Sequence, residues 1–105
     1  MLAAHTARAQ TVVDGDKITL GGTRWRLWGI DAPESRQTCK DGWPAGVEAT
    51  HYLEQLMANG PVRCEERGHD RYRRTIGLCR AGEQDLGAAM VSAGMAWAFT
   101  RYSSD

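Results

Sequence analysis

Residues 11–30 read TVVDGDKITLGGTRWRLWGI, and this stretch decides the fold of the chain. It contains three short runs that are rich in β-branched and aromatic residues, at positions 11–13, 17–20 and 23–30. Asp-Gly-Asp separates the first two runs and Gly-Gly the last two, and such dipeptides between β-rich runs are strong hairpin signals. The first third of the chain is therefore predicted to be a three-stranded antiparallel meander.

One amphipathic helix is predicted over about residues 46–58, where apolar side chains recur at helical spacing. Asn59-Gly60-Pro61 ends this helix, because glycine and proline do not continue it. One face of the helix is expected to be buried against the sheet and the other to face solvent. The expected buried side chains are Ala49, Tyr52, Leu53 and Leu56, and the expected exposed ones are Glu48, Thr50 and Gln55.

A second hairpin is predicted from residues 62–66 and 75–80. A turn between Arg71 and Tyr72 pairs residues whose numbers sum to 143, which places Cys64 directly opposite Cys79. At a non-hydrogen-bonded position of an antiparallel pair the Cα atoms lie about 4.5 Å apart, which is close enough for a disulfide. Cys39 then remains as the odd thiol.

A shorter helix is expected over about residues 85–93, before Gly94. The order of elements is then three strands, a helix, two strands and a helix. This is the order of a five-stranded OB-fold barrel, an α+β fold that binds oligonucleotides or oligosaccharides on one face. We expect a single domain over residues 11–105, preceded by a tail of residues 1–10 that is disordered or derived from an export signal.

The bulk composition excludes some classes of protein. With 42% hydrophobic and 25% charged residues, the chain has a globular composition, and no apolar run approaches the roughly 20 residues that a membrane span needs. Thirteen basic residues balance thirteen acidic ones, so any attraction to nucleic acid must be local. Ala7-Arg8-Ala9 is similar to a signal-peptidase site, so a secreted or periplasmic protein is expected. No obligate protein partner is evident.

Four carboxylates fall at the edges of the predicted strands. Asp14 and Asp16 flank a glycine, and Asp31 and Glu34 flank a proline. Because hard cations such as Ca²⁺ take carboxylate and carbonyl oxygens as ligands, two such turns side by side could form one cation site. Each turn taken alone is more typical of an ordinary hairpin or loop than of a cation site.

Two arginines are candidates for holding a phosphate, Arg26 on the third strand and Arg74 before the fifth. A phosphodiester attacked by water gains negative charge, which positive groups placed in advance stabilise. The arginine-rich stretch around Tyr72 could grip phosphates and stack a base, although a solvated hairpin has the same pattern. Strict strand alternation puts Arg26 and Asp31 on opposite faces, so a bulge or bend near Gly29 must bring them together.

Five motifs, VVDGDKITL, RLWGIDAPE, EATHYLEQL, DRYRRTIG and LGAAMVSAGMAWAF, closely resemble the staphylococcal nuclease family in order and spacing. The match covers about residues 12–102, and the first two motifs together are highly specific. The resemblance implies a Ca²⁺-dependent nuclease that hydrolyses DNA or RNA to products with 3′-phosphate ends. It implies that Asp16 and Asp31 ligate Ca²⁺ through their side chains and Ala32 through its backbone carbonyl.

The resemblance also implies roles for the remaining candidates. Glu34 matches the carboxylate that orients or deprotonates the attacking water. Arg26 and Arg74 match the two guanidiniums that hold the phosphate. Arg71 and Tyr72 fall on the loop that grips a terminal phosphate and its nucleotide. Because these side chains are all present, a nuclease is the first hypothesis, and a non-catalytic OB-fold module that binds nucleic acid, glycan or protein is the alternative.

Three departures from the family pattern affect the expected activity and stability. Lys17 stands where a threonine is usual, and its ammonium is expected to weaken Ca²⁺ binding or to help hold phosphate. Arg73 stands where glycine is common, so the loop before Arg74 is expected to take a different backbone path. Residues 99–100 leave one family aromatic without a clear counterpart, and the chain stops where relatives usually continue into another helix.

Overall fold

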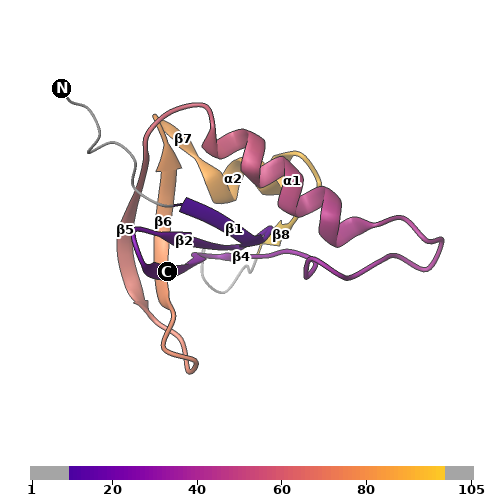
Figure 1. Cartoon of the computed structure of the whole chain (residues 1–105), viewed down its shortest axis with the longest axis horizontal. Coiled ribbons are helices and arrows are strands. Elements are labelled where there is room, and N and C mark those ends of the chain that lie inside the picture. Colours follow the sequence, from indigo (N-terminus) through magenta and orange to yellow (C-terminus); the bar gives the residue numbers. More distant parts are fainter. Residues whose placement is uncertain (1–9, 99–105) are drawn as a thin grey trace.

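The computed structural model of the chain describes residues 10–98. The predicted meander is present as β1 (Gln10–Asp14), β2 (Lys17–Leu20) and β3 (Thr23–Leu27), with both neighbouring pairs antiparallel (Figure 1). The third strand ends at Leu27, three residues earlier than expected. Its continuation is interrupted because Gly29 takes a φ of +81°, in the left-handed region that favours glycine.

Beyond this interruption the chain forms β4 (Ile30–Asp31), which pairs with β8 (Trp97–Ala98). The bend that the sequence required near Gly29 is therefore confirmed. It brings the Nη2 atom of Arg26 to 3.5 Å from Oδ1 of Asp31.

The second hairpin consists of β5 (Val62–His69) and β6 (Thr75–Ala81), and both strands are longer than predicted. β6 also pairs in parallel with β3 and antiparallel with β7 (Gln84–Asp85), which gives the main sheet the strand order β1-β2-β3-β6-β5. Within residues 10–98 no backbone ladder joins the two end strands. The parallel β3–β6 contact matters for function, because it places the loop before β6 beside the end of β3.

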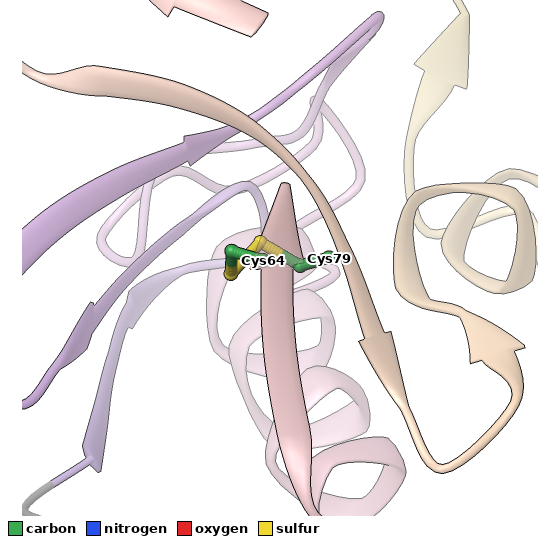
Figure 2. Close-up of a disulfide and its surroundings, with 2 residues drawn as sticks. All are labelled: Cys64 and Cys79. Carbon is green, nitrogen blue, oxygen red and sulfur yellow. A yellow bond between two sulfur atoms is a disulfide. The ribbon is translucent and has the colours of Figure 1, made fainter. Parts of the chain in front are cut away.

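Cys64 and Cys79 face each other across the β5–β6 hairpin, as predicted, and form a disulfide with a Cα–Cα distance of 4.0 Å. Figure 2 shows the two side chains joined between the strands. Cys39 is a free, exposed thiol. The disulfide therefore links the two strands that carry the arginine-rich loop.

The first helix, α1 (Ala45–Met57), lies between β4 and β5 in the chain and packs against β1 and the second helix (Figure 1). Ala49, Leu53 and Leu56 are buried and Tyr52 is partly buried, whereas Glu48 and Gln55 are exposed, as expected. The expectation for Thr50 is wrong. It lies at the border of the buried face, next to Ala49, so it is partly buried and its hydroxyl oxygen is inaccessible without a hydrogen-bond partner.

The second helix, α2 (Leu86–Ser92), begins one residue later than predicted because Asp85 is its N-cap and accepts the N–H of Ala88 at 3.0 Å. Gly94, with a φ of +75°, follows its end. Side chains from β2, β3 and both helices fill one core, whose largest fully buried apolar side chains are Ile18, Leu27, Leu53, Leu86 and Met90. Each large side chain contributes about 1.5–3 kcal/mol by leaving water. The predicted α+β, OB-type architecture is thus confirmed.

Neither of the two helices within residues 10–98 has the length and apolar character that a membrane crossing requires.

Candidate active site

Asp16 is the most buried charged residue that the structure describes, with 0% of its surface exposed. It lies in the turn between β1 and β2. Its Oδ1 atom accepts a hydrogen bond from Nζ of Lys17 at 3.0 Å, and its Oδ2 atom accepts from Nη1 of Arg26 at 2.9 Å and from the N–H of Ala32 at 3.1 Å. Burial alone would raise the pKa of Asp16, but Lys17, Arg26 and the Ala32 N–H together hold it below the usual value. The buried carboxylate is therefore charged and accepts three hydrogen bonds from the protein.

Asp31 is the second carboxylate of this cluster. Burial raises the pKa of Asp31, and the adjacent Asp16 carboxylate raises it further, while Arg26 opposes both effects. Two carboxylates that converge in this way have their negative charge only partly compensated. The structure thus brings the predicted cation ligands Asp16, Asp31 and Ala32 together at one end of β4.

The chemistry of these donors fits Ca²⁺, which takes carboxylate and carbonyl oxygens and completes its shell with water. Within residues 10–98 no group of three or more His, Cys, Asp or Glu side chains is arranged as a metal site. The predicted set differs from such a group, since it has two side-chain carboxylates and one backbone carbonyl. The remaining ligands would have to come from water or substrate.

Asp14 positions the turn that carries Glu34. Its Oδ1 atom accepts the N–H of Ser35 at 2.6 Å, and its Oδ2 atom lies 3.3 Å from Nζ of Lys17. On the other side of this turn, a Cβ atom on Gly46 would overlap the backbone carbonyl of Glu34. Glycine at the start of α1 therefore lets the helix approach the turn closely and support Glu34, whose side chain is exposed.

Arg74 is positioned by Asp70 across a tight loop. The carboxylate of Asp70 accepts the backbone N–H groups of Tyr72 and Arg74 at 2.9 and 3.0 Å and the Nε–H of Arg74 at 2.8 Å. Burial would raise the pKa of Asp70, but these N–H groups and the Arg74 charge lower it overall. The loop presents Arg71 and Tyr72 to solvent, and the guanidinium of Arg74 lies 5.3 Å from the centre of the Tyr72 ring.

Arg73 has a φ of +68° and is the one residue other than glycine within residues 10–98 with a positive φ. This is the left-handed conformation, which glycine adopts without strain and other residues adopt at a cost of roughly 1–2 kcal/mol. The expected change of backbone path is therefore not required. The loop takes a glycine-type conformation with an arginine in it.

All five predicted catalytic and substrate-binding residues line one cleft of about 600 Å³. These residues are Arg26, Glu34, Arg71, Tyr72 and Arg74. They come from β3, from the turn after β4 and from the loop before β6, and the parallel β3–β6 pairing brings these segments together. Guanidiniums that share a cleft with a carboxylate can bind a phosphate while the carboxylate accepts a proton beside it.

Comparison with known proteins agrees with this geometry. The model of the family described as "Staphylococcal nuclease homologue" matches residues 24–105. The chain belongs to this family. The match includes β3 apart from its first residue, both helices, the β5–β6 hairpin and every residue that lines the cleft except Lys17.

Several curated proteins are similar to this staphylococcal nuclease homologue. The succinoglycan biosynthesis protein ExoI of Rhizobium meliloti (strain 1021) is 39% identical over 82% of this chain and 48% of its own length. The micrococcal nuclease of Shigella flexneri is 36% identical over 87% of this chain and 56% of its own length. The thermonuclease of Staphylococcus hyicus is 28% identical over 88% of this chain and 58% of its own length. The chain thus spans about half of the length of the curated relatives that it matches.

Two cleft residues of the nuclease homologue were not identified from the sequence, Arg24 and Asp70. Arg24 lies two positions before Arg26 on β3, so strand alternation puts both side chains on the same face, and this signal was available. Asp70 had a weaker signal. An aspartate in a loop often accepts hydrogen bonds from the backbone N–H groups that follow it. The bond from the Arg74 side chain to Asp70, however, depends on how the loop folds.

Proposed function

We propose that this staphylococcal nuclease homologue is a Ca²⁺-dependent nuclease that hydrolyses phosphodiester bonds of DNA or RNA and leaves 3′-phosphate ends. The observation that carries the proposal is the cleft that is lined by Glu34 together with Arg26, Arg71 and Arg74. Family membership supports it, as do relatives named micrococcal nuclease, thermonuclease and, in Haemophilus influenzae, uncharacterized endonuclease.

Arg26 and Arg74 would bind the scissile phosphate. Each guanidinium is already held by a carboxylate, Arg26 by Asp16 and Arg74 by Asp70. The two side chains therefore lose little conformational entropy when substrate binds. In the part of the chain that the structure describes, the side chain of Arg74 bonds through Nε, which leaves its Nη groups for phosphate oxygens. Donors that are in place before the reaction stabilise the charge that builds up on the phosphate.

Glu34 would act on the attacking water. Its carboxylate accepts a proton as the water oxygen attacks phosphorus. The bond from phosphorus to the sugar 5′ oxygen breaks, this oxygen takes a proton from water and leaves as a hydroxyl, and the phosphate remains on the 3′ oxygen. The exposed side chain and the backbone supported by Asp14 and Gly46 suit a base that must reach a water in the cleft. Ca²⁺ held by Asp16, Asp31 and Ala32 would supply further stabilisation of the phosphate charge.

Tyr72 and Arg71 would bind the part of the substrate beside the cleaved bond. Tyr72 is 64% exposed and stands next to Arg74, so its ring offers a base a stacking surface close to the phosphate site. This is consistent with a single-stranded substrate segment, whose bases are free to stack.

The test is cleavage of single-stranded DNA in the presence of Ca²⁺ or EDTA. Glu34→Gln should bind metal and nucleotide but cleave roughly 10²- to 10⁴-fold more slowly, the usual contribution of a positioned acid or base. Asp16→Ala should lose Ca²⁺ affinity. Arg74→Ala should lower turnover more than substrate affinity, because its contacts strengthen in the transition state. Glu48→Gln, an exposed carboxylate on α1, is the matched control and should have full activity.

Wild-type protein that binds an oligonucleotide yet releases no 3′-phosphate ends over a long incubation with Ca²⁺ would refute the proposal that the protein is a nuclease. That result would favour the non-catalytic OB-fold binding module instead.

The proposal includes a secreted or periplasmic location, for which the Cys64–Cys79 disulfide is the support, since such bonds persist in oxidising compartments. Recovery of the protein from the cytoplasmic fraction of its host with Cys64 and Cys79 reduced would contradict this location.

A further inference from the structure

Lys17, next to the proposed cation ligand Asp16, forms ion pairs with two carboxylates. It begins β2, and its Nζ atom lies 3.0 Å from Oδ1 of Asp16 and 3.3 Å from Oδ2 of Asp14. Its side chain is 19% exposed and also lines the cleft. The ammonium is therefore held between two carboxylates and is not free in solvent.

Both oxygens of Asp16 accept hydrogen bonds from protein donors and the residue has no exposed surface, so a divalent cation has no open approach to this carboxylate unless one of these donors moves. The Ala32 N–H is fixed by the backbone. Arg26 is held at three points, by Asp16, by Asp31 and by a backbone carbonyl at 3.3 Å. Lys17 has a flexible stem and an ammonium at its end, so it is the donor that an incoming ion would displace.

The charge of the cluster leads to the same conclusion. Asp14, Asp16 and Asp31 supply three negative charges, and Lys17 and Arg26 supply two positive ones, which leaves a net charge of −1. Without Lys17 the net charge would be −2, which a divalent cation neutralises. Lys17 thus provides internally part of the charge that Ca²⁺ would bring.

We propose that Lys17 competes with Ca²⁺ for Asp16 and keeps the Ca²⁺ affinity of this chain low. This inference rests on the proposed Ca²⁺ site. Binding of the ion requires the pairs of Lys17 with Asp14 and Asp16 to break, and the displaced ammonium stays close to the ion. A unit charge about 6 Å from a divalent cation, even with the dielectric of water between them, weakens binding by roughly tenfold.

The experiment is calorimetric titration of Ca²⁺ into the protein with no nucleic acid present. Lys17→Met removes the charge and keeps much of the stem, and it should lower the dissociation constant by about tenfold. Lys40→Met is the matched control, because it removes the same charge from an exposed loop, and it should change the constant less than about twofold. Lys17→Arg keeps the charge and should bind no more tightly than wild type.

Two outcomes overturn the inference in distinguishable ways. If wild type binds Ca²⁺ as tightly as Lys17→Met, Lys17 is not a competitor, although the proposed Ca²⁺ site stands. If neither protein binds Ca²⁺, the proposed site fails and the inference fails with it.

Loss of the ammonium leaves Asp14 and Asp16 less compensated, so Lys17→Met could be unstable without metal. Thermal unfolding with and without Ca²⁺ covers this case, because ligand binding to the folded state raises the melting temperature. The rise should be larger in Lys17→Met than in wild type, and an equal or smaller rise overturns the inference.

Discussion

Reduction of the Cys64–Cys79 disulfide should destabilise the protein by an amount that follows from the position of the bond. The two cysteines are 15 residues apart in sequence. Cross-linking a loop of this length removes conformational entropy from the unfolded chain worth about 3 kcal/mol at 25 °C. Domains of this size are stable by only about 5–15 kcal/mol, so the reduced protein should lose a large part of its free energy of unfolding.

Urea unfolding of oxidised and reduced wild type, followed by tryptophan fluorescence, measures this difference. Comparing the same chain in two redox states avoids the cavity that a substitution at the buried Cys79 would leave. Thiol titration of the unfolded protein should count one thiol, Cys39, before reduction and three afterwards. Cys39→Ser should leave the oxidised stability unchanged. A difference below about 1 kcal/mol between the two redox states would refute the entropic reasoning.

Two further predictions concern the loop between β5 and β6. Arg73→Gly should raise the free energy of unfolding by about 1 kcal/mol, because glycine adopts the observed φ of +68° without strain, and a decrease in urea unfolding would contradict this. Asp70→Asn should destabilise the protein at pH 7. Because the folded pKa of Asp70 is lowered, its charge stabilises the fold above the unfolded value near 3.8 and ceases to do so as pH falls through the folded value. The stability gap between wild type and Asp70→Asn should therefore shrink below about pH 4, and a constant gap down to pH 2 would rule out this cause.

Much of the fold could be predicted because its signals are local. Asp-Gly and Gly-Gly turns marked the meander, and the expected position of the second hairpin's turn placed Cys64 opposite Cys79. The misjudged points depend on what lies across space. Thr50 borders the buried face of α1 and could not be assigned from helical spacing alone, and β3 stops early where Gly29 turns the chain.

The residues of the candidate site could be predicted from the sequence, but the hydrogen bonds that hold them in place could not. Residue types and motif order brought Arg26, Glu34 and Arg74 into one hypothesis, and the fold places all three in one cleft. The bonds that hold them were not predictable, since they join distant positions. The N–H of Ala32 reaches Asp16 across 16 residues, and the N–H of Ser35 reaches Asp14 across 21.

Lys17 and Arg73 show where local preference and the folded structure disagree. Arg73 adopts a backbone conformation that glycine would take without strain, and Lys17 places an ammonium on the carboxylate that a divalent cation would bind. By contrast, glycine occupies the other positive-φ positions of the described chain, and an aspartate is the N-cap of α2. Departures of this kind concentrate where function, rather than stability, constrains the residues. Lys17 lines the cleft, and Arg73 precedes Arg74, which also lines it. The cleft is therefore the part of this molecule whose residues stability alone does not explain.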